Sequence, residues 1–534
     1  MAADFRLARS AGAAGAATLA SRILGLARDQ VLAALFGAGN EMDAFIVAFR
    51  IPNLVRDLFA EGAMSAAFVP TFTRHLTLHG KTDAWRLANN VLNTLLIVTG
   101  VIVALGMIFA PQLVADFAPK FAAVPGKIEL TVRITRVVLP FLVLVAVAAV
   151  MMGMLNSLQH FFLPSLAPAT FNVIMIAGAF ALVPLMPRVG WPPIMAVAIS
   201  SLVGGLAQVG TQWLPLKREG FRYRALCDPR DAGLRQVLLL MGPGTLGLAA
   251  TQVNIFVSTL LATSQGTGAV SWLTYAFRIM YLPIGLFGVS IATAVLPAVS
   301  HHAAMEDRDA IRATVSRGIG LMLMLNVPAT LGLVVLATPI VRLLLEHGRF
   351  VAADTAPTAA ALQLYAVGLV GYSAARIASP TFYALGQSRV PVLVSVGSIA
   401  ANIVLSLVLV RSLGFRGLAL GTSLAALGNG ATLMVLLHKR LDGIHGRELA
   451  LTLLKVTLAA IVMAGVALPV QQHGAAIVAG HSLVAQAVRL FLAIAAGLGA
   501  LAASARLLRI KEFGDALALV QSRIVRSRGG PSQA

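Results

Sequence analysis

Apolar runs long enough to cross a lipid bilayer recur along the whole chain, and they limit its fold more than any other feature of the sequence. A helix needs about 20 predominantly apolar residues to span the hydrocarbon core. Residues 91–110, 137–155 and 451–470 are three such runs. Hydrophobic residues make up 58% of the chain and charged residues only 12%. The runs lack the short alternating pattern of a membrane β-barrel. The sequence therefore predicts an all-α polytopic membrane protein.

Hydropathy and the Gly and Pro breaks between runs together predict about fourteen transmembrane helices. No cleavable signal is expected at the N-terminus, because the first apolar run continues into residues 21–30 and is predicted to be the first span. The predicted cores of the spans are 12–36, 43–72, 88–116, 130–156, 161–185, 191–214, 236–263, 270–299, 315–344, 357–384, 390–410, 416–437, 450–470 and 482–507.

The basic residues predict the orientation of the chain in the membrane. Connections 73–87, 216–236, 300–314 and 438–449 are rich in Lys and Arg, and so is the C-terminal tail. Lys and Arg keep loops in the cytoplasm, so we expect an even number of spans with both termini cytoplasmic. The net charge of +20 follows from this bias, and no nucleic-acid partner is expected. The alternate connections are poorer in basic residues, with the exceptions of Lys120, Lys127, Arg188, Arg349, Arg411 and Arg416.

An internal repeat divides the chain. The sequence Ala-Phe-Arg-Ile occurs at 48–51 and again at 276–279, an offset of about 228 residues. In each half it lies in the second predicted span, and an even number of spans separates the two copies, so the copies run in the same direction. We therefore predict two lobes in a parallel pseudo-twofold repeat. The predicted domains are an N-terminal lobe at 1–220, a C-terminal lobe at 221–440, an additional helical pair at 441–510 and a basic cytoplasmic tail at 511–534.

Charged residues inside the second span are the first candidates for function. A charge at the bilayer centre costs about 2.5–3.5 kcal/mol, so such side chains normally face a bundle interior or water. Arg50, Asp57 and Glu61 are spaced by seven and four residues and share one helical stripe. Arg278 is the repeat equivalent of Arg50 and has no acid near it along its own helix.

A second interpretation stays open for the acids that directly follow arginines. Asp29 follows Arg28, and Asp57 follows Arg56. Each pair could lie near the end of a span, where long side chains reach the interface and the charges are solvated.

Arginines from both halves, with few acids, predict a cationic aqueous cavity between the lobes. A guanidinium binds phosphate oxygens in a bidentate manner, so a diphosphate headgroup suits such a cavity. Pro52 and Pro283 follow Arg50 and Arg278, and prolines inside spans kink helices. We expect these prolines to act as hinges for alternating access between the two sides of the membrane.

Residues 21–70 and 268–297 together carry a resemblance to a known family. The block "SRILGLARDQVLAALFGAGNEMDAFIVAFRIPNLVRDLFAEGAMSAAFVP" resembles the N-terminal signature of the MurJ (MviN) lipid II flippases. These belong to the multidrug/oligosaccharidyl-lipid/polysaccharide exporter superfamily. The resemblance implies two six-helix lobes and two C-terminal helices, and movement of undecaprenyl-diphosphate-linked disaccharide pentapeptide to the outer leaflet of the bacterial cytoplasmic membrane. It also implies contacts with membrane lipids and with the cell-wall synthesis machinery.

The resemblance also implies which residues bind the substrate. The family's cavity arginines match Arg22, Arg28, Arg56 and Arg278, of which Arg22, Arg28 and Arg278 carry over as diphosphate contacts. Its acids match Asp43 and Glu61, which would orient arginines, contact polar groups of the substrate or gate the cavity. Arg50 is added by the spacing argument alone.

Some members of the family bind sodium through carboxylates, and this chain departs from that pattern. Ser258 and Ser406 stand where acids are expected, while Asn402 and Thr422 keep two neutral ligands. Because hard cations need anionic oxygens, no cofactor is expected, sodium coupling is not predicted, and the membrane potential is the alternative driving force.

Three other functions were weighed. An enzyme is not predicted, because the chain has no HExxH, P-loop or paired CxxC motif. A multidrug antiporter for cations needs acids in its cavity, which the arginine-rich spans do not offer. A polysaccharide-lipid flippase would share the fold and the diphosphate chemistry, and only the signature block separates it from a lipid II flippase.

Overall fold

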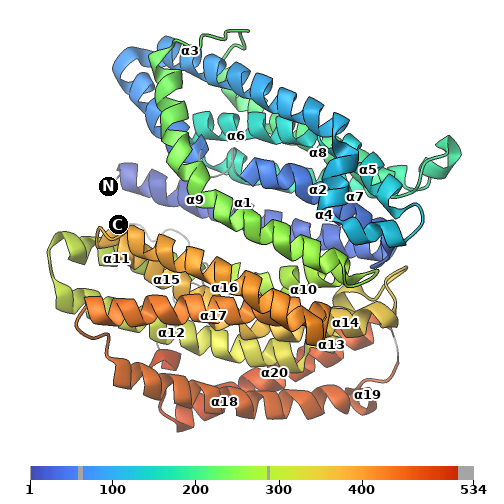
Figure 1. Ribbon diagram of the computed structural model, residues 1–534. Coiled ribbons are helices and arrows are strands. Elements are labelled where there is room, and N and C mark those ends of the chain that lie inside the picture. Colours follow the sequence, from blue (N-terminus) through green and yellow to red (C-terminus); the bar gives the residue numbers. More distant parts are fainter. Residues whose placement is uncertain (1, 58–63, 286–288, 481, 515–534) are drawn as a thin grey trace. The chain divides into compact units, whose positions relative to one another are not determined.

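The structure is a computed structural model that describes residues 2–57, 64–285, 289–480 and 482–514 (Figure 1). Within these residues every regular element is a helix, so the all-α prediction is confirmed. The N-terminal helices are α1 (Ala2–Phe36), α2 (Asn40–Arg56), α3 (Met64–Ile108), α4 (Ala110–Phe117), α5 (Lys127–Val138), α6 (Phe141–Ser157), α7 (Phe162–Leu182), α8 (Met195–Arg218) and α9 (Ala232–Thr263), with short 3₁₀ turns at Pro119–Ala123 and Met186–Val189.

The helices of the second half follow in the same manner. They are α10 (Ala269–Pro283), α11 (Val289–Ala304), α12 (Arg308–Val335), α13 (Ala337–Leu345), α14 (Ala352–Val367), α15 (Leu369–Ala384), α16 (Arg389–Leu413), α17 (Phe415–Arg440), α18 (Gly446–Gln472), α19 (Gly474–Ile477) and α20 (Leu483–Leu507). Local sequence fixes several starts: the side chains of Asp231, Asp307 and Ser482 accept a hydrogen bond from the backbone three residues on, as good N-cap residues do.

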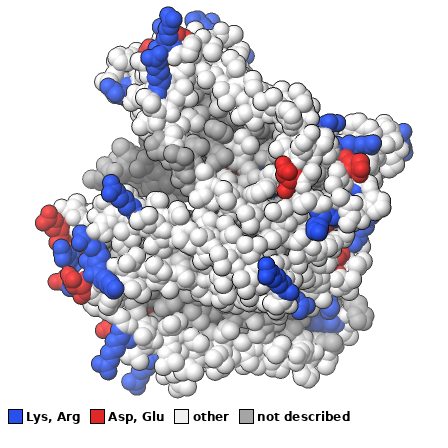
Figure 2. Space-filling model, viewed as in Figure 1, with Lys and Arg blue, Asp and Glu red and all other residues white. Residues whose placement is uncertain are grey.

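Nine helical segments among the described residues are long and apolar enough to cross a membrane. The chain is therefore a multi-pass membrane protein, although the number of fourteen spans stays a prediction. On the face in Figure 2, charged side chains gather mostly toward the helix ends and leave the middles of the helices uncharged. This distribution fits helices whose middles lie in hydrocarbon.

The predicted connection at residues 73–87 contains a break between two helices. The segment α3 consists of two helices that meet at Gly80, where the backbone is not helical. The backbone there has φ 81° and ψ −179°, which glycine adopts without a steric penalty. The connection is therefore short, and the basic residues of this stretch lie on the helix ends on both sides of Gly80.

Contacts divide the chain into two compact units. The first unit comprises Met1–Ser271 with His347–Val351, and the second comprises Trp272–Glu346 with Ala352–Ala534. The first unit extends to residue 271 because α9 packs against α3 and α4. The lobe bounds taken from the repeat stay a prediction.

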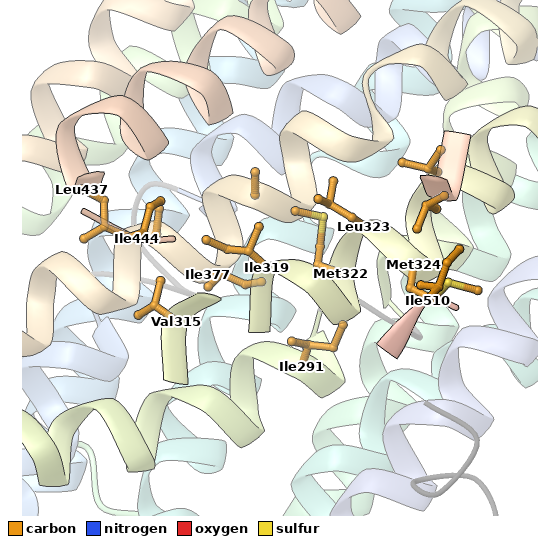
Figure 3. Close-up of a cluster of buried hydrophobic side chains, with 14 of the residues drawn as sticks. Ile291, Val315, Ile319, Met322, Leu323, Met324, Ile377, Leu437, Ile444 and Ile510 are labelled. Carbon is orange, nitrogen blue, oxygen red and sulfur yellow. The ribbon is translucent and has the colours of Figure 1, made fainter. Parts of the chain in front are cut away.

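Each unit has its own packing order. In the first unit α1 packs against α7, α7 against α8, α8 against α6, and α6 against α3. In the second unit α17 packs between α15 and α16, and the additional pair, α18 and α20, run side by side with α18 against α12. Figure 3 shows the buried cluster that joins these helices, with Ile319 and Met322 from α12 and Ile377 from α15.

The two repeat copies share a local distortion. The chain forms a π-helical turn at Asp57 after α2 and another at residues 284–285 after α10. Adding the repeat offset of about 228 to 57 gives 285, so the two turns occupy equivalent positions. Such wide turns often mark functional sites in helices. Pro52 lies inside α2 and Pro283 is the last residue of α10, next to these turns, and their role as hinges stays a prediction.

Candidate functional site

Arg28 is the best-positioned arginine of the first unit. It lies on α1, where Nε and Nη2 donate to Asp29 Oδ1 at 3.1 and 2.9 Å, and Nη1 donates to Asn172 Oδ1 of α7 at 3.0 Å. Asn172 in turn donates through Nδ2 to the carbonyl oxygen of Ser21 at 3.1 Å. The side chain of Arg28 is only 14% exposed. Its planar fork is therefore held in one orientation by two neighbouring side chains, which preorganises it for an anion.

Arg56 repeats this arrangement on α2. Its Nε and Nη2 donate to Asp57 Oδ1 at 2.9 and 2.7 Å, the same side-on geometry that Arg28 has with Asp29. Both partners are more exposed than the first pair, at 26% and 30%. At both places the acid bonds to the arginine before it, but the Arg28–Asp29 pair is largely buried and so differs from the solvated pair of the second interpretation.

The other predicted arginines have different surroundings. Arg22 is exposed on α1, and Arg50 is partly buried on α2. Arg278 belongs to the second unit, where its side chain is exposed on α10. A shared cavity in which arginines of both units meet stays a prediction. Glu61 lies outside the described residues.

Asp43 is fully buried and its carboxylate accepts four hydrogen bonds. Oδ2 accepts from Lys127 Nζ at 3.0 Å and from the amide of Gly268 at 2.8 Å. Oδ1 accepts from the amide and the hydroxyl of Ser271 at 3.1 and 2.7 Å. Asp43 therefore caps the first turn of α10, where the helix dipole favours a negative charge. Its partner is a lysine, and this arrangement ties α2, α5 and the start of α10 together.

Sequence reasoning missed Lys127 and Asn172 as partners of the predicted residues. Lys127 carried a signal, because it was an exception to the distribution of basic residues along the chain. The structure gives the reason: the side chain is buried against Asp43 and over the ring of Phe121, and so it is not an exposed loop charge. Asn172 carried no signal, since one asparagine in an apolar span has many possible roles.

The sodium ligands of the family can be tested on the donor atoms present. In α16, Asn402 and Ser406 are buried, and the Ser406 hydroxyl donates to Asn402 Oδ1 at 3.4 Å. In α17, the Thr422 hydroxyl donates to the carbonyl oxygen of Leu418 at 2.9 Å. Within the described residues no group of three or more His, Cys, Asp or Glu side chains could hold a metal. These oxygens are neutral, whereas tight sites for hard cations add carboxylates. The absence of sodium coupling stays a prediction.

The class of protein follows from the fold. The structure is similar to a solved inward-facing conformation of a multidrug resistance MATE family transporter of the MOP superfamily. The TM-score of the match is 0.66 at 18% identity, over 79% of this chain and 94% of that chain. At this identity the likeness shows a transporter fold of the MATE type.

The family follows from closer matches. A family model described as "Lipid II flippase MurJ" matches residues 32–488. The "Probable lipid II flippase MurJ" of Vibrio cholerae is 33% identical over 86% of this chain and 88% of its own. The "Lipid II flippase MurJ" of Burkholderia cenocepacia is 34% identical over 79% and 82%. A solved "Lipid II flippase MurJ, inward closed conformation" gives a TM-score of 0.76 at 25% identity, over 93% and 99%. The chain belongs to the MurJ family of lipid II flippases.

Proposed function

We propose that the protein is a lipid II flippase, which moves the undecaprenyl-diphosphate-linked peptidoglycan precursor from the cytoplasmic to the periplasmic leaflet of the bacterial inner membrane. The observation that carries the proposal is a partly buried guanidinium, Arg28, that two side chains orient within a chain whose residues 32–488 match this family. A diphosphate presents several anionic oxygens, which such a fork binds through paired hydrogen bonds.

The substrate path in this proposal is cationic. Arg22, Arg28 and Arg278 contact the diphosphate, and Arg50 and Arg56 add positive potential beside it. The carboxylate of Asp43 already accepts four hydrogen bonds from the protein. In our proposal it therefore positions helices and does not contact substrate. Movement follows alternating access, with the π-helical turns near Pro52 and Pro283 as the places where the helices bend.

The same site argues against a multidrug antiporter for cations. Such a transporter needs an accessible acid in its cavity, whereas both acids in the first turn of α2 are paired: Asp43 is buried against Lys127, and Glu41 lies 3.2 Å from Arg349. We propose that transport proceeds without sodium at the Asn402 and Thr422 positions and that the membrane potential drives it. Both termini are proposed to be cytoplasmic, and cell-wall synthesis enzymes are proposed to receive the flipped substrate.

The test is complementation in a host depleted of its own flippase, with outer-leaflet lipid II measured by labelling. The native chain should restore labelling. Arg278→Ala and Arg28→Ala should lower it by about tenfold or more, because a hydrogen bond to a charged group contributes about 1.5–3 kcal/mol. Lysine at either position should restore it only in part, since a point charge lacks the fork.

A matched control separates this effect from general loss of positive charge. Arg188→Ala removes an exposed arginine from the 3₁₀ turn at Met186–Val189 and should leave labelling unchanged. Membrane levels of each variant are measured by immunoblot. Full labelling with Arg278→Ala and Arg28→Ala at normal levels would overturn the diphosphate role, and no labelling by the native chain would overturn the flippase assignment.

A further inference from the structure

An apolar pocket of about 450 Å³ lies inside the second unit, between α12, α15, α17 and α18. This volume is within the range of about 300–1,000 Å³ that ligand pockets occupy. Its walls are aliphatic side chains, methionines and glycines. Among the described residues that line it there is no acid, and its only ionisable side chains are those of His438 and Lys439, at the C-terminal end of α17.

Small residues create the pocket. A Cβ on Gly430 would lie 2.7 Å from the carbonyl oxygen of Gly371, so α15 and α17 touch at backbone distance with no side chain between them. Ala374, Ala431 and Ala450 then face the remaining space, which their methyl groups do not fill. Ile319 and Met322, which belong to the buried cluster in Figure 3, close the α12 side.

The mouth of the pocket meets hydrocarbon. Val435 and Leu453, which line it from α17 and α18, are 55% and 43% exposed, and both helices are long and apolar enough to span the membrane. An apolar cavity of this size does not hold water, and its lining atoms lose dispersion contacts while it is empty. The chemistry of the walls therefore selects an aliphatic chain.

The basic end of the pocket selects an anionic headgroup. Within the described residues Lys439 makes no ion pair. Two nearby acids face other partners: Asp442 of the α17–α18 connection lies 3.3 Å from Arg308, and Glu448 in the first turn of α18 lies 4.0 Å from His445. Basic pockets between transmembrane helices at one membrane surface bind the phosphates of anionic lipids.

We propose that this pocket binds one acyl chain of an anionic membrane phospholipid, whose phosphate is held by Lys439 and His438. The lipid fills the space between α18 and the α12–α15–α17 group and so links the additional helical pair to its neighbours. None of the arginines assigned to the diphosphate lines this pocket, and the proposal does not depend on the proposed function.

The experiment uses the full chain, exchanged into phosphatidylcholine nanodiscs and titrated with phosphatidylglycerol, with bound lipid counted by native mass spectrometry. The native chain should retain phosphatidylglycerol over phosphatidylcholine. Lys439→Glu should lower this retention by at least about fivefold, the effect of about 1 kcal/mol for one basic side chain. Lys217→Glu reverses an exposed charge of the first unit and should leave retention unchanged.

A second pair of variants tests the pocket itself. Ala431→Phe fills it from α17, and Val435→Trp narrows its mouth at an exposed position that is outside the core. Both should reduce retention while Lys439 is intact. Normal retention in both would show that the headgroup binds at the surface alone and would overturn the proposal. Two further titrations use inorganic phosphate and a polyprenyl diphosphate as ligands. Retention of inorganic phosphate equal to that of the lipid, or retention of the polyprenyl diphosphate in place of phosphatidylglycerol, would also overturn the proposal.

Discussion

Lys127 Nζ lies 3.0 Å from Asp43 Oδ2, and the two side chains are 2% and 0% exposed. Each charge of a buried ion pair needs the other, because either one alone would be left unpaired in a medium of low polarity. The pair joins α5 to α2, and the remaining bonds of Asp43 hold the first turn of α10.

Lys127→Met should lower the free energy of unfolding by about 3–5 kcal/mol, because it leaves the Asp43 carboxylate buried without a cation. Asp43→Asn in the same chain should recover part of this loss by removing the unpaired charge. The thermal unfolding midpoint in detergent measures both effects. Lys120→Met is the matched control, since Lys120 is exposed in the preceding 3₁₀ turn. An unchanged midpoint for Lys127→Met would contradict the structural role of the pair.

Three asparagines of α3 hold the basic segment between α8 and α9. Asn89 bonds to the carbonyl oxygen of Arg222 and accepts from the amide of Arg224 at 3.1 and 2.8 Å. Asn93 bonds to the carbonyl oxygen of Arg224 and accepts from the Tyr223 hydroxyl at 2.8 and 2.6 Å. Asn90 exchanges a pair of bonds with the backbone of residue 228. The asparagine side chains thus bond to backbone groups of residues 222–228, as a neighbouring β-strand would do in a sheet.

Asn93→Leu should loosen this segment, because the carbonyl of Arg224 and the Tyr223 hydroxyl lose their partner, and each hydrogen bond contributes about 0.5–1.5 kcal/mol. Trypsin should then cleave after Arg222 or Arg224 about 5–30 times faster in detergent-solubilised protein. Asn40→Leu is the control, since its side chain bonds to Thr267 at an exposed position away from the segment. Cleavage at the native rate would contradict the role of Asn93.

Much of the fold was predictable, because membrane-length apolar runs and their glycine and proline breaks are local properties. The break at Gly80 lies inside the predicted connection 73–87, but its shortness was not predicted, since a glycine in a basic stretch is also typical of a longer loop. The role of the candidate arginines stays a prediction; the acids beside Arg28 and Arg56 were visible in the sequence, but the partners farther along the chain were not. Arg28 and Asn172 are 144 residues apart, and no local pattern links them. Lys127 is the exception, because its basic character in the wrong type of connection was visible in the sequence.

Two glycines let the segment His347–Val351 approach the turn between α1 and α2. The Arg349 amide donates to the carbonyl oxygen of Ala34 at 2.8 Å. Gly37 and Gly348 have φ of 63° and 59°, and a Cβ on Gly348 would lie 2.3 Å from the Ala34 oxygen. Backbone atoms cannot move away as a flexible side chain can. The contact therefore requires glycine for both conformation and space.

Gly348→Ala should break the bond between Arg349 and Ala34 and lower the thermal unfolding midpoint. Gly190→Ala is the control: its φ is 71°, but a Cβ there would meet no atom within 4 Å. In the control, the free energy of unfolding should fall only by the conformational cost of a left-handed alanine, about 1–2 kcal/mol. The further fall in Gly348→Ala then measures the steric clash. Hydrogen exchange should also increase at Arg349 in Gly348→Ala. Equal effects of both substitutions would contradict the close approach.

Glu219, at the end of α8, gives the protein a pH dependence outside the spans. Lys81 Nζ donates to Oε2 at 2.9 Å, and His160 Nε2 lies 2.9 Å from Oε1. These hydrogen bonds, that of Lys81 first, lower the pKa of Glu219 from its usual 4.5. A carboxyl whose pKa is lower in the folded chain stabilises the fold above its unfolded pKa, and that contribution is lost as pH falls through the folded pKa. Unfolding midpoints should therefore fall as the pH is lowered below 4.5, the usual value, and this carboxyl should have no effect on them above it. Glu219→Gln should reduce this slope without changing it above the usual pKa, and Glu448→Gln, which alters an exposed acid, should not reduce it. A slope in Glu219→Gln equal to that of the native chain would assign the acid sensitivity to other carboxyls.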